Sequence, residues 1–185
     1  DTICHEHLEY YSTSIICEMA KQNDLKVFDH MYNDINGGSS RFFISHADSK
    51  FKVSHKKIRK IIKNEKKLGI MKVKKYKSFF KKINQSKKKL IHLLENLKKK
   101  GCTFHGYGAS TKGNVLLQFY KINNRFLDYI CERNPQKYNL YTPGSSIKII
   151  SEKKSRMLKP DYYLVLPWHF KNEILKRESQ IRKKG

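Results

Sequence analysis

The stretch Gly-Tyr-Gly-Ala-Ser-Thr-Lys-Gly-Asn at residues 106–114 decides the fold of the second half of this chain. A short run at 102–105 precedes it, and an apolar run at 115–120 follows it. This is the layout of a strand, a glycine turn and a helix N-terminus, where free backbone N–H groups can meet an anion. The spacing fits neither the phosphate-binding lysine loop nor Gly-x-Gly-x-x-Gly. We therefore expect either an anion site or a tight turn without a ligand.

The segments after this turn alternate between strand-like and helix-like patterns. Apolar runs at 126–131, 146–150 and 161–166 predict strands, and residues 172–183 predict a closing helix. Strands that alternate with helices are typical of a parallel α/β sheet. We therefore expect an α/β domain over residues 101–185.

The first part of the chain predicts a helix and an antiparallel pair of strands. Residues 11–23 have helical spacing, and the strand-like runs 25–31 and 41–46 lie on either side of a Gly-Gly loop. Residues 49–100 are helical and basic, with an apolar stripe formed by Ile83, Leu90, Leu94 and Leu97. Three parts result, at 1–48, 49–100 and 101–185, with the middle part as a connector.

The net charge of +24 is concentrated in the connector, where residues 51–100 hold 20 Lys or Arg against Glu65 and Glu95. Such a field attracts any polyanion. However, 33 of the 40 basic residues are Lys, whereas interfaces that read bases rely on Arg. A basic module that binds RNA or another polyanion stays an alternative, but we expect no specific nucleic-acid partner.

Hydropathy and cysteine spacing predict the partners and the cellular compartment of the protein. No run of about 18 apolar residues occurs, so we expect no membrane partner. The four cysteines are scattered without a Cys-x-x-Cys pair, which favours free thiols in a reducing cytoplasm. We further expect a monomer.

Cys4-His5-Glu6-His7 is the densest titratable cluster. In an extended chain His5 and His7 share one face while Glu6 points the other way. A His-x-His pair can bind a metal, but no further ligands have a suitable spacing, and we expect no metal here. A Glu–His pair can also transfer protons near neutral pH, and ordinary structural roles stay open.

Residues 1–12 together with 106–114 resemble motifs of the sugar C-methyltransferases, which use S-adenosylmethionine and act on nucleotide-linked keto-sugars. The resemblance covers residues 1–47 and 101–185, with further matches at 37–41, 132–135, 141–144 and 166–168. It implies that residues 1–48 end a class I methyltransferase sheet and that 101–185 form a Rossmann-like, mostly parallel domain. The loop for S-adenosylmethionine and a zinc-binding N-terminal domain would lie upstream, so we expect this piece alone to be inactive.

The resemblance also implies roles for individual residues. A base removes the proton next to the keto group, and the resulting enolate attacks the methyl group of the donor. By position His7 resembles this base, with Glu6 as its partner and His5 in the same cluster. The C-terminal domain would help to hold the nucleotide-sugar. The expected substrate contacts are Cys4, Tyr10, Arg41, Gly108, Ser110, Thr111, Lys112, Asn114, Arg133 and Trp168.

Cys4 departs from the family pattern, which has tyrosine at this position. A thiol is a poor hydrogen-bond donor, so it does not replace a phenol. Three explanations stay open: a different substrate, compensation by another residue such as Tyr10, or impaired activity. A related protein with lost or altered chemistry is accordingly a further alternative.

Overall fold

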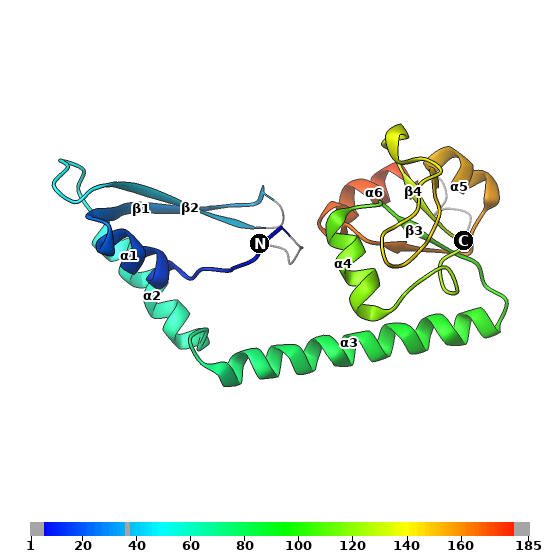
Figure 1. Ribbon diagram of the computed structural model, residues 1–185, viewed down its shortest axis with the longest axis horizontal. Coiled ribbons are helices and arrows are strands. Elements are labelled where there is room, and N and C mark those ends of the chain that lie inside the picture. Colours follow the sequence, from blue (N-terminus) through cyan, green and yellow to red (C-terminus); the bar gives the residue numbers. More distant parts are fainter. Residues whose placement is uncertain (1–5, 36–37, 180–185) are drawn as a thin grey trace. The chain divides into compact units, whose positions relative to one another are not determined.

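The computed structural model describes residues 6–35 and 38–179, which are divided into two compact units (Figure 1). The first unit is Glu6–Asn84, and the second begins at Gln85. The division falls inside the long helix α3 (Val73–Lys99). The three-part partition expected from composition stays a prediction. Its last boundary lies at Gly101, whereas the second compact unit already begins at Gln85.

The first unit consists of an antiparallel hairpin with two helices. The hairpin pairs β1 (Leu25–Asn33) with β2 (Ser39–His46), which confirms the predicted antiparallel pair. Helices α1 (Thr13–Gln22) and α2 (His55–Leu68) both lie against it (Figure 1). Their common core is formed by Ala20, Val27 and Ile58, one residue from each of α1, β1 and α2.

A β-bulge at Phe28 determines which side chains of β1 face the helices. Val27 pairs with Ile44 and His30 pairs with Phe42, and the register shifts by one residue between these pairs. Because Phe42 and Ile44 are two residues apart, they share a face of β2. Val27 and His30 therefore also share a face, although they are three residues apart. The bulge thereby makes His30 a fully buried residue of this unit.

The N-terminus of α1 is capped by the preceding Ser12 and by Glu65 of α2. Ser12 Oγ accepts a hydrogen bond from the Ile15 N–H at 3.3 Å. The carboxylate of Glu65 on α2 accepts bonds from the N–H groups of Thr13 and Ser14 at 2.6 and 3.1 Å. Burial acts to raise the pKa of Glu65, but these hydrogen bonds outweigh it and keep the pKa below its usual value. Glu65 thus joins α2 to the positive end of α1.

The second unit is a four-stranded parallel sheet in the order β5-β4-β3-β6. The strands are β3 (Phe104–Tyr107), β4 (Tyr129–Glu132), β5 (Ile149–Ser151) and β6 (Tyr162–Val165). The helices are α4 (Thr111–Tyr120), α5 (Glu152–Leu158) and α6 (Lys171–Arg177), with short 3₁₀ turns at Pro135–Lys137 (η2) and Trp168–Phe170 (η3). The predicted α/β fold is confirmed. The chain adds β4 and β5 on one side of β3 and then crosses to β6 on its other side, so the strand order reverses next to β3.

Alternation along the strands gives the sheet two different faces. Phe104 faces the larger core with the buried Leu94 and Leu117 of α3 and α4, and Leu90 and Leu97 pack against the same core. This confirms the inward stripe on the second half of the connector. The opposite face carries His105 and Tyr107, which contact α5 and α6.

Candidate functional site

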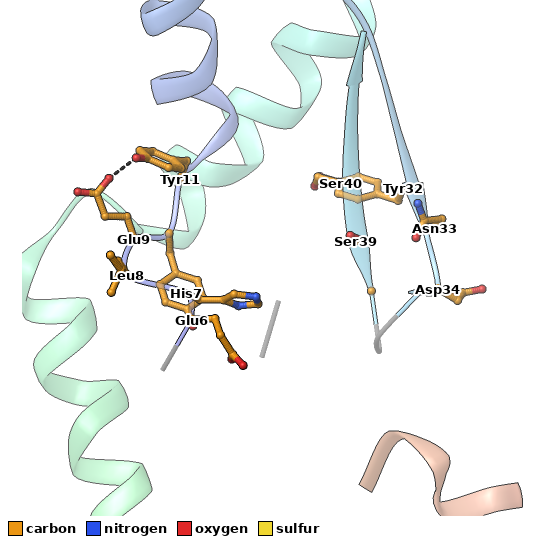
Figure 2. Close-up of a pocket in the computed structure, with 12 residues that line it drawn as sticks. Glu6, His7, Leu8, Glu9, Tyr11, Tyr32, Asn33, Asp34, Ser39 and Ser40 are labelled. Atoms are coloured by element: carbon orange, nitrogen blue, oxygen red, sulfur yellow. Dashed lines mark hydrogen bonds between the residues drawn. The ribbon is translucent and has the colours of Figure 1, made fainter. Parts of the chain in front are cut away.

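A cavity of about 970 Å³ in the first unit contains the predicted catalytic pair (Figure 2). One side is the segment before α1, and the other is formed by the adjoining ends of β1 and β2. This volume is in the range of small-molecule sites. The lining residues are Glu6, His7, Leu8, Glu9, Tyr10, Tyr11, Tyr32, Asn33, Asp34, Gly38, Ser39 and Ser40.

His7 and Glu6 are accessible to a ligand in this cavity. Both side chains are exposed, and Figure 2 shows the His7 ring on the side that faces the two strands. The His7 ring lies edge-on to Tyr10 with the ring centroids 6.1 Å apart. Nearby, the Tyr11 hydroxyl donates a hydrogen bond to Glu9. An accessible imidazole next to a carboxylate in sequence is suited to proton transfer near neutral pH.

The remaining predicted residues of this region have different positions. Tyr10 lines the cavity, but Arg41 does not. On β2 the lining residues are Ser39 and Ser40, which directly precede Arg41. Cys4 and His5 lie outside the described residues.

The wall opposite His7 was missed by the sequence prediction. It consists of polar residues at the end of β1, where Tyr32, Asn33 and Asp34 follow one another. Their position directly before the Gly-Gly loop was the available signal, because strand ends and loops commonly carry binding residues.

A second cavity, of about 370 Å³, lies at the carboxyl edge of the parallel sheet. Of the predicted contacts, Gly108, Ser110 and Arg133 line it, whereas Thr111, Lys112, Asn114 and Trp168 are not among its lining residues. The residues that the prediction missed are Tyr107, Ala109, Glu132, Lys137, Glu152, Pro167, Phe170, Glu173, Ile174 and Arg177.

The glycines of the 106–114 turn are required for close packing. Gly108 has a φ of +85°, and a Cβ there would lie 2.8 Å from Pro167 Cγ. A Cβ at Gly113 would lie 2.7 Å from the Cβ of Leu166. Leu166 and Pro167 come directly after β6. The two glycines therefore allow the turn and α4 to pack closely against the end of that strand. The structure thus supports the tight-turn explanation for these two residues.

An internal carboxylate occupies part of the predicted anion site. Glu132 Oε2 accepts a hydrogen bond from the Ala109 N–H at 2.8 Å, and its Oε1 accepts bonds from the N–H groups of Arg133 and Asn134 at 2.8 and 3.0 Å. Lys137 donates to the Ala109 carbonyl at 2.8 Å. The turn therefore does hold an anion, and this anion belongs to the protein itself.

A network of charged side chains lies beside the second cavity. Glu178 accepts hydrogen bonds from the Tyr107 hydroxyl at 2.7 Å and from Arg156 at 2.5 Å. Arg156 also binds Glu152 at 2.9 Å. Burial and the hydrogen bond to Glu178 raise the pKa of Tyr107 far above its usual value, and Arg156 lowers the pKa of Glu178. Tyr107 therefore stays a neutral donor that fixes α6 to the end of β3.

The charges that line the second cavity balance one another. Three carboxylates stand against three cationic side chains: Glu132, Glu152 and Glu173 against Arg133, Lys137 and Arg177. Several of these groups already pair, as Arg177 does with Glu152 at 3.6 Å. A cavity of this kind offers hydrogen bonds to a polar ligand without strong selection for negative charge.

Residues 6–35 and 38–179 contain neither a cluster of metal ligands nor a membrane-spanning helix. No group of three or more His, Cys, Asp or Glu in this part is arranged to hold a metal ion. None of the helices in the same part is long and apolar enough to cross a membrane.

Comparisons with known proteins agree with the fold and identify the family. C-methyltransferase NovU of Streptomyces niveus is 29% identical over 185 residues, and the match covers 100% of this chain. The chain spans 44% of the length of that relative. Residues 34–185 match the family described as the C-methyltransferase C-terminal domain. Because this match covers most of the sequence, the chain belongs to the C-methyltransferase C-terminal domain family.

Proposed function

We propose that this chain carries the proton-abstracting and acceptor-binding part of a methyltransferase that methylates a carbon next to the keto group of a nucleotide-linked sugar. The observation that carries the proposal is the position of His7 and Glu6 on an open cavity of about 970 Å³ whose other wall is polar. Membership of a C-methyltransferase family supplies the reaction class.

In the proposed reaction His7 is the base. Its neutral imidazole takes the proton from the carbon next to the ketone, and the electron pair of the C–H bond becomes the enolate. Glu6 is proposed to orient His7 and to stabilise its protonated form. Hydroxyl and amide groups of Tyr32, Asn33 and Ser39 are the proposed contacts for the sugar, because they line the same cavity.

S-adenosylmethionine, which the family implies, supplies the methyl group when bound. The N-terminus of α1 does not form a cradle for it, since the preceding residues are Tyr10, Tyr11 and Ser12 instead of glycines. Its first N–H groups are taken by Ser12 and Glu65. We therefore assign no residue of this chain to the donor and derive no step through it.

The second cavity is proposed as a binding surface for uncharged polar groups of the acceptor. Ser110 and Arg133 line it, together with the backbone of Gly108. Its balanced charges favour hydroxyl or base groups over phosphate. Thr111, Lys112, Asn114 and Trp168 stay predictions from the resemblance.

Proton abstraction can be measured without methyl transfer. The complete protein is incubated with a nucleotide-linked keto-sugar in D₂O without donor, and deuterium at the carbon next to the ketone is followed by mass spectrometry. We expect His7→Ala to lower this exchange at least 100-fold, because general-base catalysis contributes a factor of about 10²–10⁴. His46→Ala, an exposed histidine of β2 that does not line the cavity, is the matched control.

Methyl transfer by the same protein in the presence of donor completes the test. Exchange and methyl transfer that survive in His7→Ala would exclude His7 as the base. A well-folded complete protein that gives neither exchange nor product would favour the alternative of lost or altered chemistry.

A further inference from the structure

A groove of about 610 Å³ lies between the end of β1 and one side of α2. We call it the lysine groove and define it by its lining residues, which are His30, Met31, Tyr32, Lys57, Lys60, Ile61, Lys63, Asn64 and Lys67. Tyr32 also lines the cavity that contains Glu6 and His7. The groove and the candidate catalytic cavity are therefore neighbours within the first unit.

The groove carries a strong positive charge. Four lysines line it and no carboxylate does. Lys57 is paired with Asp29 at 2.8 Å, whereas no ion pair among the described residues involves Lys60, Lys63 or Lys67. The acidic residue of α2, Glu65, is directed to the N-terminus of α1. Like charges that line one groove repel one another, so an anion bound there would lower this repulsion.

His30 gives an independent indication of a binding site at this groove, which it lines. Its side chain is fully buried, and neither ring nitrogen has a hydrogen-bond partner among the described residues. The ring packs edge-on to Tyr32 and Phe42 with centroid separations of 4.5 and 4.9 Å. Buried polar atoms without a partner are rare in proteins, and a functional role such as binding an ion is one explanation for them.

The spacing of the lysines indicates the class of ligand. Lys60, Lys63 and Lys67 recur at helical intervals on α2, and seven residues of helix span about 10 Å. Ammonium groups spread over this length match several linked negative charges better than one carboxylate. Lysine is a common phosphate binder that acts as a point charge. Asn64 adds an amide donor at the same groove.

We propose that the lysine groove binds a diphosphate group. The groove lies beside the proposed catalytic cavity, so the diphosphate would be either the linking group of the acceptor or a separate phosphate ligand. Only the first source rests on the proposed function, whereas the site itself does not.

The site is tested by titrating the chain with inorganic pyrophosphate in a calorimeter at fixed salt concentration. The groove variant is Lys60→Gln, Lys63→Gln, Lys67→Gln, and we expect it to weaken binding at least tenfold. The matched control, Lys74→Gln, Lys77→Gln, Lys81→Gln, removes the same charge at the same spacing from exposed positions of α3 and should change binding less than twofold. Because all six lysines are exposed, we expect both variants to fold like the native chain, and circular dichroism checks this.

A second readout locates the ligand. The imidazole ¹⁵N signals of His30 should shift on addition of pyrophosphate in the native chain and stay unchanged in the groove variant. Three outcomes would each overturn the proposal. Absence of pyrophosphate binding would show that there is no site. Equal weakening in the two triple variants, or His30 signals that do not move, would show that the lysines attract the anion only diffusely.

Kinetics of the complete protein distinguish the two sources. A tenfold rise in KM for the nucleotide-linked sugar at unchanged kcat in the groove variant would assign the groove to the acceptor. Loss of pyrophosphate binding with an unchanged KM would support a separate phosphate ligand. Pyrophosphate binding requires no turnover, so failure of the proposed methyl transfer would leave this test intact.

Discussion

At the scale of single residues, His30 makes the stability of the first unit depend on pH. Burial and the charge of Lys57 lower the pKa of His30 below its ordinary 6.5, although Asp29 and Glu65 oppose the effect. Between the lowered pKa of the folded state and 6.5, the unfolded chain binds a proton that the folded chain does not. The unit is therefore fully stabilised above pH 6.5 and loses stability as the pH falls below it.

We expect His30→Phe to remove this dependence. Hydrogen-exchange protection factors of the β1 amides, compared at pH 7.5 and 5.5, should fall with pH in the native chain and change less in the variant. His46→Gln, at an exposed position of the partner strand β2, should behave like the native chain. Equal losses of protection in all three proteins would show that another group causes the effect.

Glu178 is a nearly buried carboxylate of the second unit that bonds with Arg156 and Tyr107. Glu178→Gln weakens its bonds with Arg156 and Tyr107, and we expect a loss of about 1.5–3 kcal/mol, the usual range for hydrogen bonds to charged groups. The single tryptophan, Trp168, lies in this unit and reports its urea unfolding by fluorescence.

The control for Glu178 is another glutamate near the same cavity. Glu173→Gln affects only the longer, exposed pairs with Arg133 and Arg177 at 3.8 and 3.7 Å, so it should cost less than about 0.5 kcal/mol. Because Arg156 keeps the pKa of Glu178 below 4.5, its contribution is complete above that pH and is lost as the pH falls through the folded value. Similar losses in both variants would contradict this ranking.

At the scale of elements, α1 depends on a cap supplied by α2. Glu65→Ala leaves two N–H groups of the first turn without their acceptor, and we expect it to cost about 1–2 kcal/mol. Hydrogen exchange of the α1 amides gives the measurement. Glu95→Ala, an exposed glutamate of α3, is the control and should have little effect. Unchanged protection of α1 in Glu65→Ala would mean that Ser12 alone caps the helix.

Periodic patterns predicted most elements because they are local properties of the chain. The hairpin, the basic helices and the parallel sheet all follow from such patterns. The strand predicted at 102–105 in fact begins at Phe104 and ends at Tyr107, so Gly106 lies inside β3. What was missed depends on contacts distant in sequence, such as Glu132 at Ala109, Pro167 at Gly108 and Glu65 at Thr13. Local patterns carry no information on these partners.

At the scale of the whole molecule, the second unit needs part of the connector. Leu90, Ile91, Leu94 and Leu97 of α3 cover the core of the parallel sheet. Removing them would expose apolar surface worth about 25 cal/mol per Å². The boundary suggested by composition at Gly101 therefore cuts through a core, whereas a boundary at Gln85 does not.

We expect a fragment of residues 85–185 to unfold cooperatively, with Trp168 fluorescence and far-ultraviolet circular dichroism giving the same midpoint. A fragment of residues 101–185 should lack this transition. A matched version of the longer fragment with Leu94→Ala should be destabilised by about 2–5 kcal/mol, since Leu94 is nearly fully buried. A cooperative transition in the shorter fragment would instead place the boundary at Gly101.

The bulge at Phe28 also constrains how β1 can change in evolution. A deletion of one residue there would restore regular alternation and send either Val27 or His30 to the opposite face. Most substitutions in this strand affect one side chain, but such a deletion would exchange buried and exposed positions along half of it. The sequences of relatives that lack the extra residue should therefore be aligned with this chain separately on each side of position 28.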